Sequence, residues 1–327
     1  MSGAEETIDE ILKEIALCGY EVVSFNSIER FLLYNKEYSK VLDNDIRIEF
    51  DVYTKYILNN PKTYMEKLGE FIAEYMPDII FTQFFDISLI RRFVGTKTKI
   101  ICFIHAAMSE EESIQYDEAD LYVCLSNFIA STIHFSNKNV YVMYPLIKKR
   151  KYYINSTWHE KNNILFINPI KSKGIEIIIN LARNYSSENF IIFENWRRTQ
   201  KKYVEEIKKL SNVTLRDLSS NPIEIYSDVK LLLFPSQAPE GFGRCIVEAN
   251  FNGIPVIASK VGGIVEAAGQ ILIAKYTDIR EWEKALSAVL NNNNYYKILS
   301  EKALRNSERF DSQEVHGLIN TIKGLRI

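Results

Sequence analysis

The chain has 327 residues, enough for two domains of ordinary size that each bury their own core. Hydrophobic residues make up 46% and charged residues 25%, which is the composition of an average soluble globular protein. A formal net charge of -2 excludes the basic surplus typical of nucleic-acid-binding proteins, and no apolar run reaches the length of a membrane span.

The cysteines and the N-terminus both indicate a cytoplasmic protein. Cys18, Cys102, Cys124 and Cys245 lie in apolar stretches without a C-x-x-C pair, which is typical of reduced thiols. The N-terminus lacks the charged-then-apolar pattern of a signal peptide. The basic run 148–151 leaves contact with the inner face of a membrane open, although four charges on a linker are more often solvated.

Strands and helices alternate through the first half of the chain. Apolar residues at helical spacing predict helices at 4–18, 61–75, 87–94 and 127–135, with Ser126 as the N-cap of the last. Short apolar runs predict strands at 20–25, 45–50, 78–82, 99–104, 119–125 and 139–143. This alternation predicts a parallel, doubly wound sheet. His105 follows the strand 99–104, at a carboxyl end where ligands bind in such sheets.

A second α/β pattern follows the basic and polar segment 145–161, which is predicted to be the interdomain linker. Strands are predicted at 163–167, 190–193, 213–215, 229–234, 255–258 and 270–273. Helices are predicted at 175–184, 222–227, 245–250 and 279–291, with a turn or cap at 291–294 and two more helical patterns in 303–326. We therefore expect one domain at 1–147 and a second at 148–312.

The stretch from Leu231 to Gly269 combines a strand, a glycine-containing loop and a helix N-terminus. Such a unit favours an anion such as a diphosphate, because it presents backbone N–H groups and the positive end of a helix dipole. Glu240 and Glu248 bracket the loop, and carboxylates are good acceptors for paired hydroxyls. A nucleotide-sugar fits this pattern. By spacing alone, a solvated loop carboxylate and an exposed helix residue remain the simpler explanation.

The same stretch resembles the signature of the retaining glycosyltransferases of family 4. The matching residues are Pro239-Glu240-Gly241-Phe242-Gly243, Glu248-Ala249, Gly253 to Ser259, Gly262-Gly263 and Glu266. The resemblance implies a GT-B fold, with two Rossmann-like domains facing a cleft and a last helix, 313–327, that returns to the first domain. It implies an EC 2.4 enzyme that transfers a sugar from a nucleoside-diphosphate sugar to a hydroxyl acceptor with retention, without a bound metal or other cofactor.

The resemblance also implies roles for individual residues. Glu240 is expected to hold donor-sugar hydroxyls, His105 to face the donor sugar, and Lys173 to contact the diphosphate. Further donor contacts are expected from Gly3, Lys171, Gly241, Phe242, Gly243, Arg244 and Glu248, the last on the ribose hydroxyls.

Two departures from the family pattern stand out. Family members begin with a strand before the first glycine loop, whereas only Met1 precedes Ser2-Gly3-Ala4-Glu5, so another segment or a partner chain is expected to fill that place. The arginine that usually follows the strand 163–167 is replaced by Asn168 or Pro169. Lys171, or the pair Arg197-Arg198, is expected to supply the missing charge.

Two alternatives stay open. Asp43-Asn44-Asp45 fits the D-x-D pattern of a metal-dependent transferase, although an acidic turn before a strand explains it more simply. The two departures also motivate a nucleotide-sugar-binding or scaffolding subunit without catalysis. The donor sugar, its base and the acceptor are not identified by the sequence.

Overall fold

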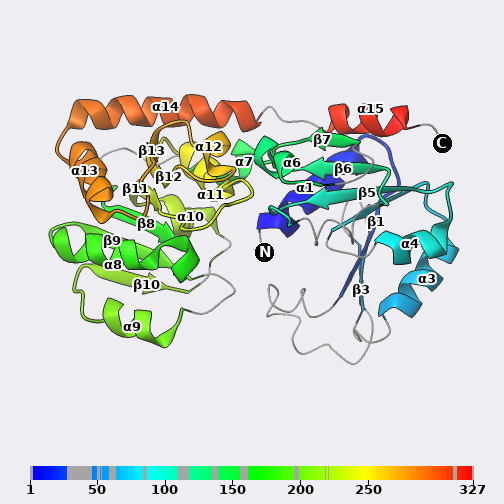
Figure 1. The fold of residues 1–327 in the computed structure, drawn as a ribbon, viewed down its shortest axis with the longest axis horizontal. Helices are drawn as coiled ribbons and strands as arrows, with labels where there is room; N and C mark the ends of the chain where they lie inside the picture. The colour runs from blue at the N-terminus through cyan, green and yellow to red at the C-terminus, as the bar shows by residue number, and fades with distance from the viewer. Residues whose placement is uncertain are drawn as a thin grey trace. The chain divides into compact units, whose positions relative to one another are not determined.

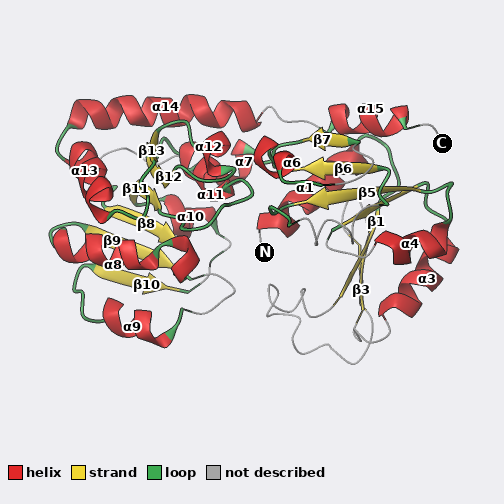
Figure 2. Cartoon of the chain, in the orientation of Figure 1, coloured by secondary structure: helices red, strands yellow, loops and turns green. Residues whose placement is uncertain are grey.

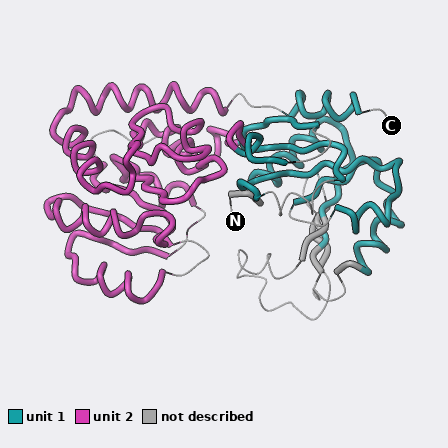
Figure 3. The backbone as a smooth tube through the Cα atoms, viewed as in Figure 1, with its two compact units in different colours: residues 1–125, 129–146, 314–327 teal, residues 126–128, 147–313 magenta. Residues whose placement is uncertain are grey.

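The computed structural model describes residues 3–27, 46–49, 52, 54–58, 64–83, 87–109, 118–134, 139–154, 161–194, 199–217, 219, 221–311 and 315–325. The chain divides into two units (Figure 3). The first comprises 1–125, 129–146 and 314–327, and the second comprises 126–128 and 147–313. Strands and helices alternate along both (Figure 2).

The first unit contains a four-stranded sheet in the order β4-β5-β6-β7, with all neighbours parallel (Figure 1). Its strands are β4 (Ile79–Thr82), β5 (Lys99–Ile104), β6 (Leu121–Cys124) and β7 (Val140–Val142). Helices α1 (Gly3–Leu17), α3 (Tyr64–Tyr75), α4 (Ile87–Val94) and α15 (His316–Gly324) belong to this unit, and α6 (Asn127–Ser131) spans the division. Burial of nearly every residue of β5 and β6 explains their continuous apolar runs.

A smaller sheet in the first unit has the order β1-β3-β2. It consists of β1 (Val23–Ser27), β2 (Ile46–Glu49) and β3 (Thr54–Leu58), with β1 parallel and β2 antiparallel to β3. The strand β3 was not predicted, because its five residues include Lys55 and show no alternation. The strand predicted at 20–25 begins later, since Gly19 at φ 90° ends the helix and the next residues form the connection.

The second unit contains a six-stranded, all-parallel sheet. Its strands are β8 (Asn163–Ile167), β9 (Asn189–Phe193), β10 (Val213–Arg216), β11 (Val229–Phe234), β12 (Val256–Ser259) and β13 (Ile271–Ile273), in the order β10-β9-β8-β11-β12-β13. Counted within the unit, this is the order 3-2-1-4-5-6 of dinucleotide-binding Rossmann folds. The order reverses between β8 and β11, so the loops after these two strands border the ligand-binding crevice expected of such a sheet.

The helices of the second unit pack on the hydrophobic strands. They are α7 (Lys149–Tyr152), α8 (Ile175–Asn184), α9 (Lys201–Ile207), α10 (Pro222–Tyr226), α11 (Arg244–Asn250), α12 (Ile264–Ala267), α13 (Ile279–Leu290) and α14 (Asn293–Asp311), with the 3-10 turn η4 (Lys171–Lys173). In the core, isoleucines of α8 pack with side chains of the inner strands and with Trp282 of α13, which is fully buried. Each such aliphatic side chain contributes roughly 1.5–3 kcal/mol by leaving water.

Four helices of the second unit, α7, α9, α12 and α14, depart from the sequence-based expectation, and α12 was not predicted. Residues 291–294, which were expected to form a turn or cap, do cap a helix, because Asn292 Oδ1 accepts the Tyr295 N–H at 2.9 Å. The helix that begins there, α14, continues unbroken to Asp311. The helix α9 was not predicted. Within the predicted linker, 149–152 forms α7, and Asn252 fixes its end by donating to the Tyr152 carbonyl at 2.8 Å.

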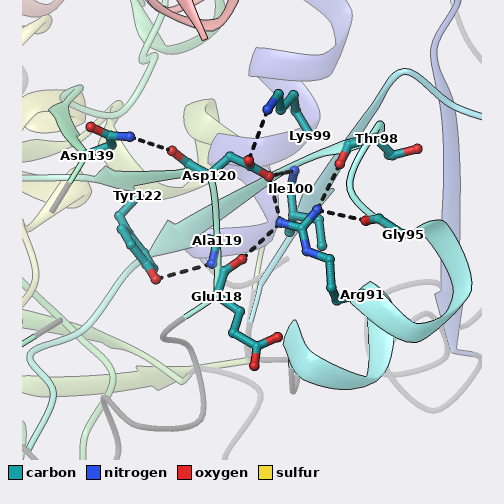
Figure 4. A network of polar contacts seen from close by, with 10 residues as sticks. All are labelled: Arg91, Gly95, Thr98, Lys99, Ile100, Glu118, Ala119, Asp120, Tyr122 and Asn139. Carbon is teal, nitrogen blue, oxygen red and sulfur yellow. Dashed lines mark hydrogen bonds and ion pairs between the residues drawn. The ribbon is translucent and has the colours of Figure 1, made fainter. Parts of the chain in front are cut away.

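A polar network in the first unit joins the amino ends of β5 and β6 (Figure 4). Asp120 accepts from Arg91 at 2.7 Å, from the Ile100 N–H at 2.9 Å and from Lys99 at 3.3 Å. Arg91 also donates to three carbonyls, those of Gly95, Thr98 and Glu118. Burial alone would raise the pKa of Asp120, but these hydrogen bonds and the Arg91 charge outweigh it and hold that pKa below its ordinary value.

We expect Asp120→Asn to destabilise the first unit by about 2 kcal/mol, because the neutral amide leaves Arg91 and Lys99 without a charged partner. The wild-type contribution is present above the ordinary carboxyl pKa of 3.8 and is lost as the pH falls below it. Hydrogen exchange of the β5 and β6 amides measures the loss. Glu301→Gln, which breaks an exposed pair with Arg305, is the control; an equal effect of both variants would contradict the assignment.

Candidate functional site

The loop after β8 approaches the loop after β11 through Gly174. Gly174 has φ 86°, and a Cβ placed there would lie 2.1 Å from the Pro235 carbonyl oxygen. The Gln237 N–H donates to the Ser172 carbonyl at 2.7 Å, which joins the same two loops. A glycine after Lys173 is therefore a steric requirement, and it brings η4 against the loop that carries Glu240.

The turn at Gly262 and Gly263 supports the Glu240 loop from the other side. The Gly263 N–H donates to the Glu240 carbonyl at 2.8 Å. A Cβ on Gly263 would lie 2.1 Å from the Gly241 carbonyl oxygen, and Gly262 has φ 57°. Gly262 and Gly263 of the signature thus allow two backbone segments to pack closely.

Lys173 and Glu240 meet where the strand order reverses. Their side chains form an ion pair, with 26% and 16% of the side chains exposed. The Ser236 hydroxyl donates to Glu240 Oε1 at 2.7 Å. A cation and a carboxylate, both within reach of solvent, therefore stand at the position where a Rossmann sheet binds a nucleotide.

Glu248 lies in a buried polar cluster on α11. Its Oε2 accepts from the Tyr226 hydroxyl at 2.7 Å, and its Oε1 lies 3.5 Å from Arg244 Nε. Arg244 also donates to the Tyr152 hydroxyl at 3.1 Å. Burial and the negative charge of Glu248 raise the pKa of Tyr226 well above its ordinary value, so the phenol stays protonated.

Other predicted donor contacts occupy different environments. Phe242 is 5% exposed, and its ring packs edge-to-face on Phe310 of α14, at 5.3 Å between centroids. A donor contact from Phe242 would therefore come from its backbone. Lys171 is exposed on η4. Gly243 has φ 108° and is the N-cap of α11, and Gly3 is the first residue of α1.

Asn168 directly follows β8, at the predicted arginine position. It adopts a left-handed conformation with φ 68°, which asparagine tolerates better than most residues. Its backbone N–H donates to the Phe193 carbonyl at 2.9 Å. Its side-chain Oδ1 is shielded from solvent and has no hydrogen-bond partner in the described part of the chain. Arg197-Arg198 and Asp43-Asn44-Asp45 lie outside the described residues.

The start of α6 is capped by a distant carboxylate. Glu266 accepts from the backbone N–H groups of Asn127 and Phe128 at 2.9 Å and 2.8 Å. The Ser126 hydroxyl donates to the Gly241 carbonyl at 2.7 Å. Ser126 therefore precedes the helix as predicted, but Glu266 binds its first amides and Ser126 holds the Glu240 loop.

His105 directly follows β5 in the first unit. Both ring nitrogens are shielded from solvent, and the ring stacks on Phe103 at 6.4 Å between centroids. Burial lowers the pKa of His105 from 6.5 to about 4, because the charged imidazolium is disfavoured away from water. The imidazole is therefore neutral at neutral pH.

Most of the second unit matches a model of a known protein family. Residues 149–306 match the model of the glycosyl transferases group 1. An uncharacterized glycosyltransferase of Methanocaldococcus jannaschii is 26% identical over 215 residues, which cover 59% of this chain and 56% of that protein. A 42.6 kDa uncharacterized protein from the cps region of Klebsiella pneumoniae is 25% identical over 53% of this chain and 47% of its own length. The chain thus spans about half the length of these curated relatives.

Solved structures confirm the predicted GT-B fold, with two Rossmann-like domains. A sucrose-phosphate synthase of Thermosynechococcus elongatus superposes with a TM-score of 0.76 at 15% identity, covering 97% of this chain and 91% of that one. A glycosyltransferase of Rickettsia africae superposes with a TM-score of 0.73 at 16% identity, covering 99% and 95%. The match and the fold agree with the predicted enzyme class, EC 2.4.

Among the described residues, no group of three histidine, cysteine, aspartate or glutamate side chains is placed to hold a metal ion. No helix in the described ranges is both long and apolar enough to cross a membrane.

Three residues of the second unit were missed by sequence reasoning. Ser236 and Tyr226 hydrogen-bond the two glutamates, and Tyr152 accepts from Arg244. Ser236 lies four residues before Glu240 in the same loop, so its position was a usable signal. Tyr226 lies on another helix, and no spacing in the sequence connects it to Glu248.

The depressed pKa of His105 predicts a loss of stability in mild acid. The buried neutral ring of His105 contributes about 3 kcal/mol to the free energy of unfolding above pH 6.5. This contribution is lost as the pH falls from 6.5 to 4. His105→Gln should lack this dependence. An NMR titration, with the variant spectrum assigning the signal, measures the pKa directly; a midpoint near 6.5 would contradict the burial of the neutral ring.

Proposed function

We propose that the chain transfers a sugar from a nucleoside-diphosphate sugar to a hydroxyl acceptor, with retention of configuration and without a metal ion. The observation that carries the proposal is the Lys173–Glu240 pair between the loops of β8 and β11. These groups have opposite charge and suit opposite parts of one ligand, a diphosphate and a set of sugar hydroxyls. The group 1 match over residues 149–306 supports the same ligand class.

Charge stabilisation is the proposed source of catalysis. The bond between the anomeric carbon and the diphosphate breaks, and negative charge develops on the leaving phosphate. Lys173 and the amides of the Gly241–Gly243 loop, with Lys171 and Arg244 as further donor contacts, are proposed to stabilise this charge. The acceptor hydroxyl gives its proton to a phosphate oxygen as its own oxygen bonds the same face of the anomeric carbon. The products are the glycoside and the nucleoside diphosphate.

The two glutamates are proposed to divide the donor between them. Glu240, beside Lys173, holds sugar hydroxyls, and Glu248, deeper on α11, holds the ribose hydroxyls. In the first unit, His105 and Gly3 stay proposed donor contacts. A neutral imidazole at position 105 suits a hydrogen bond to a sugar hydroxyl, because it both donates and accepts.

A thermal-shift screen tests whether the chain binds a donor. One relative by fold, HepE of Anabaena, was solved with UDP-glucose at 19% identity and a TM-score of 0.64, so UDP-glucose begins the panel, with GDP-mannose and other nucleotide-sugars beside it. A ligand at one hundred times its Kd stabilises the fold by about 2.7 kcal/mol. Product stereochemistry by NMR tests retention, and unchanged activity in EDTA tests metal independence. Binding without any hydrolysis or transfer would favour the non-catalytic subunit.

Substitution of the glutamates tests the division of roles. We expect Glu248→Gln to weaken binding of UDP or GDP about tenfold, since it loses one charged acceptor. Glu240→Gln should leave this affinity unchanged and lower kcat about 10²-fold, because its contacts are proposed to matter in the transition state. Calorimetry and steady-state kinetics measure the two effects. Equal losses of nucleotide affinity would contradict the division. Gln is preferred to Ala because it retains an acceptor for Tyr226.

A further inference from the structure

Each glutamate of the proposed donor site accepts a hydrogen bond from one buried hydroxyl. Ser236 Oγ lies 2.7 Å from Glu240 Oε1, and Tyr226 Oη lies 2.7 Å from Glu248 Oε2. Ser236 and Tyr226 are each 1% exposed. The two hydroxyls come from different elements, the loop after β11 and the end of α10, and each approaches its carboxylate from the protein interior.

We propose that Ser236 and Tyr226 are positioning residues of the donor site, with Ser236 orienting Glu240 for the sugar and Tyr226 orienting Glu248 for the nucleotide. This inference rests on the proposed glycosyltransferase function. Neither hydroxyl is itself proposed to touch the donor, since both are enclosed by protein.

Ser236 matters because the donor diphosphate competes with Glu240 for Lys173, the other partner of Glu240. Lys173 pairs with Glu240 in the ligand-free chain, and the same ammonium is proposed to bind the donor diphosphate. A diphosphate carries more charge than one carboxylate and draws Lys173 toward itself. Ser236 has no such competitor, so it holds the Glu240 carboxylate in place when Lys173 turns to the phosphate.

The geometry of the loop directs the Ser236 proton to Glu240. The hydroxyl lies 2.7 Å from Glu240 Oε1, 3.0 Å from the Ala238 carbonyl and 3.3 Å from the Ser172 carbonyl. A serine has one proton to donate, and an ionised carboxylate is the strongest acceptor of the three. The loop itself is fixed by the Gln237 N–H on the Ser172 carbonyl.

Tyr226 fixes Glu248 in a comparable way. Its phenol occupies one carboxylate oxygen, while Arg244 approaches the other at 3.5 Å and is itself tied to Tyr152. A carboxylate has about four acceptor positions, and the ribose hydroxyls are proposed to use those that face the donor. Without the phenol, the carboxylate is free to rotate toward Arg244, and the acceptor geometry for the ribose is lost.

The variants Ser236→Ala and Tyr226→Phe test the proposal, with UDP and UDP-glucose as probes and GDP with GDP-mannose as the second pair. Tyr226→Phe should raise the Kd of the nucleoside diphosphate about tenfold and change kcat less than twofold. Ser236→Ala should leave that Kd unchanged, lower kcat about tenfold, and reduce the preference for the nucleotide-sugar over the nucleoside diphosphate.

Two control variants, one at buried Ser300 and one at half-buried Tyr296, measure the general effect of deleting a hydrogen-bonded hydroxyl in the same unit. Ser300→Ala removes a hydroxyl bonded to the Gly253 carbonyl, and Tyr296→Phe removes one bonded to the Lys230 carbonyl at 2.8 Å. Neither carbonyl belongs to the loops after β8 and β11. These controls should lower the melting temperature without changing Kd or kcat. A double-mutant cycle adds specificity: Ser236→Ala should have no further effect on kcat or donor preference in a Glu240→Gln background.

The outcomes separate this inference from the proposed function. A wild-type chain that binds no nucleotide-sugar contradicts both. If the wild type binds or turns over a donor, but Ser236→Ala and Tyr226→Phe behave as the controls do, only the positioning roles are overturned. They are also overturned if both variants lower nucleotide affinity equally. If the donor binds without turnover, the Kd of the nucleoside diphosphate and the donor preference still test each residue.

Discussion

The close backbone approach between the loops after β8 and β11 is the constraint on which the proposed site depends. Gly174 lies against the Pro235 carbonyl, and Gly262-Gly263 lie against the backbone of Glu240 and Gly241. A Cβ at Gly174 or at Gly263 would lie 2.1 Å from a backbone carbonyl oxygen, so a side chain at either position would force the loops apart. Gly174, Gly262 and Gly263 therefore set how closely Lys173 and Glu240 approach each other, although none of the three is proposed to contact the donor.

The polar groups at the amino ends of the parallel strands differ in role from those at the carboxyl ends. In the first unit, the Arg91–Asp120 network lies at the amino ends of β5 and β6 and is saturated with partners, which is typical of a stabilising cluster. His105 lies at the opposite, carboxyl end, where burial of its ring lowers its pKa to about 4. In the second unit, Lys173 and Glu240 likewise follow carboxyl ends and stay partly exposed to solvent.

Periodicity and apolar runs predicted most elements of both units, including β5, β8, α4 and α8 with their observed bounds. The elements missed were those whose local signal is weak. Thr54–Leu58 is a short central strand that contains a charged residue, and Lys201–Ile207 is a short, highly charged helix whose burial rests on Tyr203 and Ile207. Such segments take their structure from packing partners that lie far away in the sequence, so a local pattern does not reveal them.

For the proposed site, the sequence by itself indicated Glu240, Glu248, Lys173 with the glycine after it, and the loop-to-helix unit of 231–269, because these residues lie in short local motifs that resemble a known signature. Only the tertiary structure decided how each is held: Ser236 on Glu240, Tyr226 and Arg244 on Glu248, Glu266 on the first amides of α6, and Phe242 turned into the core against Phe310. The reason is physical. The strand order decides which elements lie together, and so decides which groups can hydrogen-bond a buried carboxylate. The order 3-2-1-4-5-6 brings together loops that are far apart in the chain, such as those of Lys173 and Glu240, which are 67 residues apart.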